Sequence, residues 1–224
     1  MFYNLNKKLL KFLKKFFSPI RIGTSIGKTL LFIWLKKDLS KISGNLGIDL
    51  AGGAMLNKRF FKTNSYICVD IDQGKLDNGK QENPDGVIVN EDINVYMKRN
   101  YQNKPDVLLC VQTIGTNIKF NHEETLKIIE SMFNFLNQKG SMVFNIGLSS
   151  GDLKVIENKL KIFFEGKFEK VQSKFYGTLH SSSHLYVHPY LRFFLAYVMH
   201  IIPPLRTFFG LEKKKLYFFC KNKK

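Results

Sequence analysis

The sequence predicts an α/β fold built on a mostly parallel sheet of seven strands, with helices on both faces. Two observations lead to this prediction. From residue 46 onward, short apolar runs alternate with segments of helical periodicity, as in parallel sheets joined by helical crossovers. In addition, residues 47–72 are expected to form a strand, a glycine-containing turn, a short helix and a second strand that ends in an acid. This order brings the turn and the acid to one edge of the sheet, where open α/β folds bind ligands.

The strands are expected where short apolar runs are bounded by turn residues. These runs are residues 46–50, 66–69, 87–90, 106–111, 141–146, 168–175 and 215–220. A helix is expected after Asn121, because this residue can cap the first turn, and Glu123 and Glu124 suit the positive end of the helix dipole. Residues 153–164 form a further predicted helix.

The composition fits one globular domain with an unusual charge. The chain has 35 Lys and Arg against 18 Asp and Glu, a formal net charge of +17. Such a balance favours partners that carry phosphate, meaning nucleic acid or an anionic membrane surface. The three cysteines are far apart and are expected to be free thiols in a reducing compartment. Because no apolar run approaches the roughly 18 residues that span a bilayer, and no secretory signal is recognisable, we expect a cytoplasmic protein.

Residues 1–42 are predicted to be a helical extension that precedes the main domain, residues 43–224. The extension carries nine lysines and Arg21 against a single acid, Asp38. Its apolar residues recur at three- and four-residue steps and predict a basic amphipathic helix, followed by a second helical run at 25–35; they are Phe2, Leu5, Leu9, Phe12 and Phe16. Two interpretations remain open: a helix that lies on an anionic membrane, or a helix packed on the domain with a solvated basic face.

An apolar insertion, residues 177–210, is predicted before the last strand. It contains three histidines spaced four apart, His180, His184 and His188, which are candidates for a general base if the acceptor must lose a proton. On a helix they would share one face and could bind metal. Since three serines and Pro189 disfavour a helix there, a polar loop without metal is expected. Residues 191–202 are apolar nearly all round; contact with a membrane interface, a lid helix and a dimer interface are the alternatives.

With these elements in place, the chain resembles the class I S-adenosylmethionine-dependent methyltransferases, which have a Rossmann-like fold. The resemblance covers residues 44–176 and the last strand. The family's first motif, an acid followed by alternate glycines, corresponds to residues 49–55, where only Gly53 keeps a family glycine and Ala51 and Met55 replace two others. An acidic motif follows the third strand, and residues 104–110 are similar to the family's fourth motif. The turn at 138–141 matches the one before the fifth strand.

The resemblance implies S-adenosylmethionine as the cofactor and a role for each matching residue. The acid at 70 would bind the ribose hydroxyls with an apolar neighbour beside the adenine, the 91–93 motif would read the adenine amine, and residues 111–112 would line the methionine end. The implied cofactor-binding residues are Asp49, Ala51, Gly52, Gly53, Asp70, Ile71, Glu91, Asp92, Ile93, Val111 and Gln112. The chemistry of the residues agrees, because an adenosine needs an acid for its diol and a bare turn for its tail.

The sequence therefore predicts a methyltransferase that acts on a glycan or lipid-linked acceptor at the inner membrane surface, as a peripheral protein. Two alternatives stand beside it. One is an RNA methyltransferase, which the basic charge would also serve. The other is a degenerate, non-catalytic protein of the same fold bound to a membrane, suggested by the missing glycines at Ala51 and Met55.

Overall fold

The computed structural model describes residues 26–99, 102–115, 121–147, 152–177, 189–205 and 215–224, with backbone alone at 189–192. The chain divides into two compact units. The first comprises residues 1–36 and 177–211, and the second comprises residues 37–176 and 212–224. The basic amphipathic helix predicted within 1–25 lies outside the described residues.

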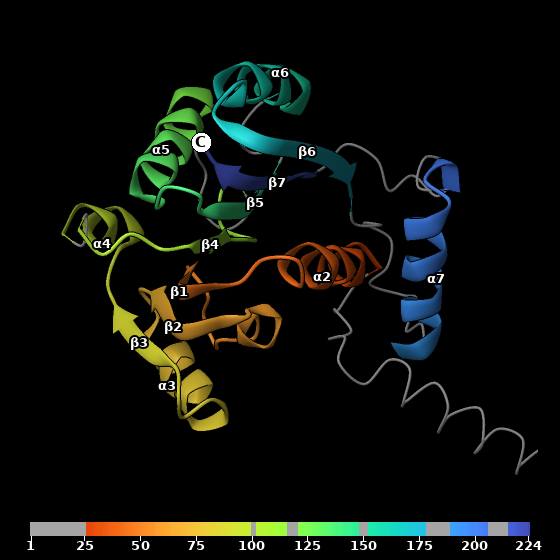
Figure 1. Ribbon diagram of the computed structural model, residues 1–224. Coiled ribbons are helices and arrows are strands. Elements are labelled where there is room, and N and C mark those ends of the chain that lie inside the picture. Colours follow the sequence, from red (N-terminus) through yellow and green to blue (C-terminus); the bar gives the residue numbers. More distant parts are fainter. Residues whose placement is uncertain (1–25, 100–101, 116–120, 148–151, 178–188, 206–214) are drawn as a thin grey trace, which may run out of the picture. The chain divides into compact units, whose positions relative to one another are not determined.

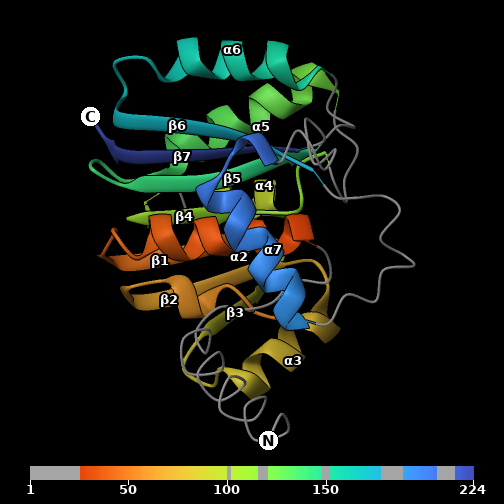
Figure 2. The ribbon, with the colours of Figure 1, turned by 90° about the vertical axis from the view of Figure 1, so that its right-hand side faces the viewer.

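The second unit contains the predicted seven-stranded sheet, seen from the side in Figure 2 with its strands stacked from β6 to β3. The strand order is β3-β2-β1-β4-β5-β7-β6. Every neighbouring pair from β3 to β5 is parallel, and β7 runs antiparallel to both β5 and β6. The strands are β1 (Gly44–Leu50), β2 (Thr63–Asp70), β3 (Val87–Asn90), β4 (Val107–Cys110), β5 (Ser141–Gly147), β6 (Phe168–Tyr176) and β7 (Lys215–Lys223).

Helices cover both faces of this sheet (Figure 1). Side chains of the helices that follow β3, β4 and β5 share one apolar core with Ile48, Leu108 and Phe144 of the strands. The helix that follows β2 instead packs Leu76 against Tyr66 and Cys68, which alternate with the core-facing residues of β2 and point to the opposite face. These helices are α4 (Ile93–Arg99), α5 (His122–Phe135), α6 (Leu153–Phe164) and α3 (Gln73–Glu82).

Local sequence signals explain where the helices of the second unit begin. The side chain of Asn121 accepts a hydrogen bond from the N–H of Glu124, and the Glu124 carboxylate accepts one from the N–H of Asn121, so the predicted cap is a reciprocal capping box. Asp72 and Asp152 cap α3 and α6 with single carboxylates.

The connection from β1 to β2 differs from the prediction. Residues 51–62 contain only the three-residue 3₁₀ helix η1 (Lys58–Phe60) in place of a short α-helix. Three residues near its start, Ala51, Gly53 and Met55, have φ between 53° and 54°. A right-handed helix needs negative φ, so it cannot begin in this stretch.

The first unit contains two described helical segments. Most of α2 (Ile26–Leu39) belongs to it, as does α7 (Pro189–Ile201), which begins two residues before the apolar run predicted at 191–202. The indole N–H of Trp34 on α2 donates to Nδ1 of His200 on α7 over 3.0 Å. None of the described helices is both long and apolar enough to cross a bilayer.

Candidate functional site

The carboxyl ends of four parallel strands bring most of the predicted cofactor residues to one edge of the sheet. Leu50 at the end of β1 pairs with Val69 of β2 on one side and with Cys110 of β4 on the other. Asp70 pairs with Asn90 at the end of β3. The strand order reverses between β1 and β4, and such a switch point is where open α/β sheets bind ligands.

The turn after β1 keeps the backbone shape that glycines usually supply. Ala51 and Met55, which replace two family glycines, both have positive φ, as does Gly53. This left-handed conformation costs a non-glycine residue about 1–2 kcal/mol, so the surrounding structure must hold it in place. Ala51 and Met55 therefore adopt positive φ at a cost in conformational energy that glycine would not have.

Asp49 lies directly beneath this turn and is fully buried. Its Oδ2 accepts hydrogen bonds from the Tyr66 hydroxyl at 2.9 Å and the Asn57 amide at 3.1 Å. Its Oδ1 is buried and has no hydrogen-bond partner within the described part of the chain. Burial raises the pKa of this carboxyl from 3.8 to about 7, against the opposing effect of the two hydrogen bonds. A Cβ on Gly52 would come within 2.6 Å of Oδ2, so the turn rests on the carboxyl itself.

The predicted ribose acid, Asp70, bridges the turn and the loop that follows β2. Its Oδ2 accepts the N–H of Gly53 at 2.8 Å, and its Oδ1 accepts the N–H of Asp72 at 2.9 Å. The side chain is half-buried, and each oxygen can accept a further hydrogen bond. Ile71 beside it is 70% exposed, so an apolar side chain faces solvent next to the Asp70 carboxylate.

The end of β3 is tied to the same loop. The N–H of Glu91 donates to the carbonyl of Asp70 at 3.1 Å, and the Glu91 carboxylate pairs with Arg99 at 3.0 Å. Asp92 is exposed and accepts the N–H groups of Asn94 and Val95 at the start of α4.

Two of the predicted residues, Ile93 and Val111, have buried side chains. Ile93 is buried in the main core, and Val111 is 6% exposed. Gln112 follows Val111 in a left-handed conformation, with φ at 63°, and its N–H donates to Oδ1 of Asn145 on β5 at 2.6 Å. Asn145 is fully buried, and among the described residues its Nδ2 has no partner.

Sequence reasoning missed three residues that shape this edge: Asn57, Tyr66 and Asn145. Asn57 and Tyr66 supply the two hydrogen bonds to Asp49, and Asn145 holds the Gln112 backbone. A polar Asn145 inside an otherwise apolar strand was the one available signal, because a buried amide requires a partner. The three candidate bases, His180, His184 and His188, lie outside the described residues.

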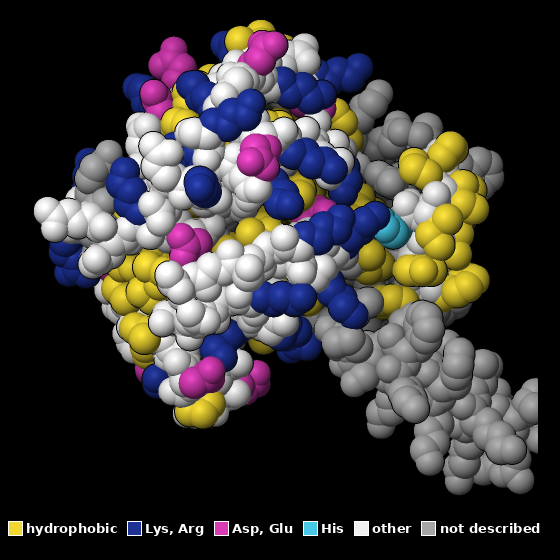
Figure 3. Space-filling model, viewed as in Figure 1, with side chains coloured by type: hydrophobic (Ala, Val, Ile, Leu, Met, Phe, Trp, Pro, Cys, Tyr) yellow, Lys and Arg dark blue, Asp and Glu magenta, His cyan; other side chains and the backbone are white. Residues whose placement is uncertain are grey.

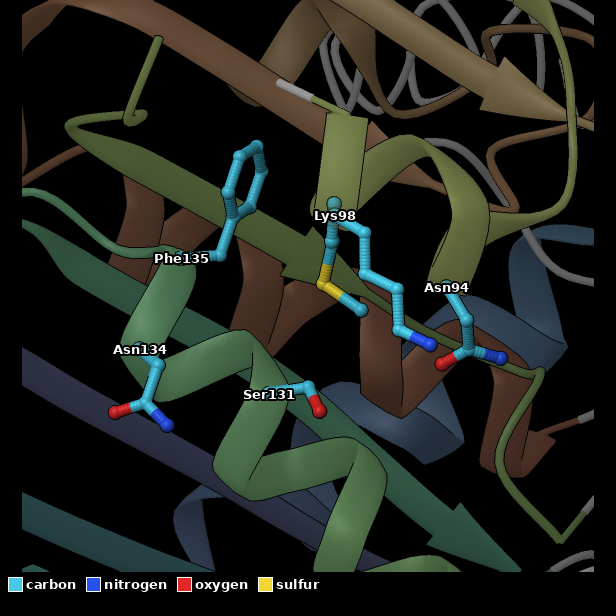
Figure 4. A pocket seen from close by; sticks show the side chains of 6 residues that line it. Asn94, Lys98, Ser131, Asn134 and Phe135 are labelled. Carbon is cyan, nitrogen blue, oxygen red and sulfur yellow. The ribbon is translucent and has the colours of Figure 1, made fainter. Parts of the chain in front are cut away.

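A separate hollow of about 180 Å³ lies between α4 and α5 (Figure 4). Lys98 and Asn94 reach into it from α4, and Ser131 lines it from α5. None of the predicted cofactor residues lines this hollow, so it is distinct from the strand-end site. Within the described ranges, no group of three or more His, Cys, Asp or Glu could hold a metal ion.

No protein-family model and no curated protein gives a significant match to the sequence. Solved structures do match the fold. The plantazolicin methyltransferase BamL, in complex with a triazolic desmethylPZN analog and SAH, is 10% identical with a TM-score of 0.55, covering 97% of this chain and 91% of its own. The fold is that of class I S-adenosylmethionine-dependent methyltransferases.

Further solved methyltransferase structures share this fold. The N-methyltransferase NodS from Bradyrhizobium japonicum WM9 is 11% identical with a TM-score of 0.53, covering 88% of this chain and 94% of its own. NodS was also crystallised with S-adenosyl-L-homocysteine. A SAM-dependent methyltransferase from Agrobacterium tumefaciens matches with a TM-score of 0.52 at 13% identity, over 66% of this chain and 54% of its own.

Proposed function

We propose that this protein binds S-adenosylmethionine at the carboxyl edge of β1–β4 and transfers its methyl group to an acceptor. The observation that carries the proposal is the bridge between Asp70 and the bare turn at Gly53, next to the exposed Ile71. S-adenosylmethionine, when bound, supplies an electrophilic methyl group on a sulfonium cation.

The residues at this edge fit such a ligand. Asp70 has oxygen lone pairs for a ribose diol, and Ile71 offers an apolar surface for a flat base. Gly53 leaves no side chain over the turn, so the amino-acid tail of the ligand can approach the backbone closely there. The N–H groups of Gly52 and Gly53 themselves already donate to the Val69 carbonyl and the Asp70 carboxylate. The fully buried Asp49 beneath the turn carries one oxygen that has no hydrogen-bond partner among the described residues, and this carboxylate favours a cation above the turn whenever it is ionised.

The chain's own contribution to catalysis is positioning. Methyl transfer is an in-line displacement, and holding two reactants in alignment removes much of its barrier. Asn145 fixes the strained backbone of Gln112, which lies two residues after the end of β4 at the switch point. A left-handed non-glycine residue held by a buried side chain is the kind of rigid strand end from which a reacting group can be placed accurately.

Acidic groups at the edge contrast with the charge of the whole chain. Asp49, Asp70, Glu91 and Asp92 all lie here, although the protein carries a net charge of +17. Local negative charge favours a cationic ligand, and the remaining basic surface favours an anionic acceptor or its surroundings.

For the acceptor, we propose a glycan or a lipid-linked molecule at the inner membrane surface. The support is the concentration of lysines and apolar residues in residues 1–42 and the apolar α7, because basic and apolar groups together suit a lipid headgroup region. If the acceptor is a hydroxyl, His180, His184 and His188 are the candidate bases. RNA is the alternative acceptor that the net charge supports.

Isothermal titration of S-adenosyl-L-homocysteine and S-adenosylmethionine tests the cofactor. We expect micromolar affinity that Asp70→Ala weakens by about 1–3 kcal/mol, the scale for leaving hydroxyl partners unpaired. Asp77→Ala is the matched control, because Asp77 is an exposed acid of α3 whose carboxylate accepts a hydrogen bond from the Gln73 amide. Absence of binding by the wild type would leave the non-catalytic alternative, and equal affinity in both variants would place the ligand elsewhere.

Methyl-transfer assays with lipid extracts and with RNA then distinguish the two proposed acceptors. Methyl transfer to lipid extracts but not to RNA supports the lipid-linked acceptor. Methylation of RNA, with salt-sensitive retention and no lipid product, would replace it.

A further inference from the structure

We propose that the exposed face of α7 is a membrane-docking surface that inserts into an anionic lipid bilayer. This inference deepens the proposed function by naming the surface that meets the membrane, and it rests on that function only for the location of the acceptor.

Helix α7 is apolar on two opposite faces, of which one is buried. Phe193, Ala196 and Met199 recur at three-residue steps and are at most 1% exposed. Trp34 holds the same helix through its hydrogen bond to His200. This face is therefore already buried and is not available to a further partner.

The other face is apolar and exposed. Phe194, Tyr197 and Ile201, spaced three and four residues apart, are 58%, 39% and 59% exposed, and Ile202 after the helix is 47% exposed. In Figure 3, hydrophobic side chains gather along the segment that Figure 1 labels α7. A surface helix of a globular protein would carry polar residues at these positions, so this face requires an apolar environment.

The charge of the unit that contains α7 indicates which partner covers the exposed face. Residues 1–36 carry eight Lys and Arg, residues 177–211 carry two, and neither segment contains a single Asp or Glu. All 18 acids of the chain therefore lie in the other unit. An apolar helix face in a purely basic unit is complementary to anionic headgroups above an acyl layer, where such helices bury their apolar side chains.

The same charge disfavours the other occupants. A second copy would bring two units of like charge together, which opposes association. RNA would meet the basic charge, and its bases could stack on Phe194 and Tyr197, but the equally exposed aliphatic side chains of Ile201 and Ile202 offer no ring for stacking. A bilayer satisfies both the charge and the aliphatic surface.

The test is sedimentation of the full chain with vesicles. We expect binding to an equal mixture of phosphatidylcholine and phosphatidylglycerol and much weaker binding to phosphatidylcholine alone. The double variant Phe194→Ser/Ile201→Ser should bind the mixed vesicles about tenfold to a hundredfold more weakly, because two apolar side chains lose their burial.

A matched control uses α6, which also exposes aliphatic residues. Val155 and Ile162 are 43% and 72% exposed there, in the unit that holds all the acids. Val155→Ser/Ile162→Ser should bind the vesicles as the wild type does. An equal loss in both double variants, or no loss in either, would overturn the proposal. So would a wild-type dimer that the α7 variant dissociates while vesicle binding stays unchanged.

Titration of S-adenosyl-L-homocysteine on the same samples keeps the two proposals apart. Retained affinity in the α7 variant shows that its fold is intact. If the wild type binds vesicles but not the cofactor, the docking surface stands and the enzymatic function fails; the reverse result rejects the docking surface alone.

Discussion

The two edges of the sheet each hold an aspartate that accepts two backbone N–H groups, yet the two residues do different work. At the amino edge, Asp106 accepts from Asn45, Leu46 and the Asn137 amide. At the carboxyl edge, Asp70 accepts from Gly53 and Asp72, next to the exposed Ile71.

The difference lies in what each carboxylate joins. Asp106 ties the start of β1 to the start of β4 and to the turn before β5, and a Cβ on Gly44 would collide with it. Although partial burial acts to raise its pKa, hydrogen bonds from Asn137, Leu46 and Asn45 lower it below the usual value. Asp70 joins only two loops that follow strands. The same local chemistry therefore ties two strand starts together at one edge, whereas at the other edge it joins two loops beside an exposed Ile71.

The largest expected effect is a pH dependence of the free energy of unfolding, and it comes from a third acid, the buried Asp49. Its pKa rises from 3.8 to about 7 on folding, so the folded state keeps a proton that the unfolded state loses. The stability from this group is complete below pH 3.8 and is lost as pH rises through about 7, by up to about 1.4 kcal/mol per pH unit and roughly 4 kcal/mol in total.

Asp49→Asn should remove this dependence, because an amide does not titrate. Urea unfolding across the mildly acidic and neutral range measures it, with Asp77→Asn as the exposed control. Parallel curves for wild type and Asp49→Asn would show that the buried carboxyl does not titrate in this range.

The next effect tests the amino edge. Asp106→Ala should lower the free energy of unfolding by about 3 kcal/mol, because two backbone donors and one amide lose a charged acceptor. Affinity for S-adenosyl-L-homocysteine should change little, in contrast to Asp70→Ala. Chemical denaturation and calorimetry of both variants provide the comparison. A loss of affinity in Asp106→Ala as large as its loss of stability would remove the distinction between the edges.

A smaller effect is expected at the turn above Asp49. Gly52→Ala should destabilise the fold by about 2 kcal/mol and weaken cofactor binding, because overpacking forces the surrounding atoms to move. Its Cβ would lie 2.6 Å from Asp49 Oδ2 and 2.7 Å from Cys68 Sγ. Gly74→Ala is the control, since its Cβ would lie 3.6 Å from the nearest atom, in the first turn of α3. A lower melting temperature for Gly74→Ala than for Gly52→Ala would contradict this view of the turn.

The smallest expected effect is a loss of stability at the start of α5 without a change in cofactor affinity. Asn121→Ala removes the side-chain half of the capping box on α5 and should lower stability by about 1 kcal/mol with unchanged cofactor affinity. Ser131→Ala, on the exposed side of the same helix, should change neither. Denaturation midpoints and calorimetry check both, and an affinity loss in Asn121→Ala would extend the site to the start of α5.

Much of this architecture follows from the sequence because its signals are local. The run at 87–90 is β3 and the run at 153–164 is α6, as predicted, since apolar spacing and caps act within a few residues. Asp70 at the end of β2 was predicted for the same reason. The short helix after β1 was not found, because positive φ at Ala51, Gly53 and Met55 depends on the carboxyl and strand that support the turn.

The sequence by itself determined which residues form strands, which acid ends β2 and where charge and apolar residues accumulate, because these properties depend on neighbours along the chain. Only the tertiary structure decided that β7 runs antiparallel, that Tyr66 and Asn57 bury Asp49, and that Asn145 holds Gln112 from 33 positions away. Strand pairing and burial join residues that are remote in sequence, and no local pattern encodes which of them will meet.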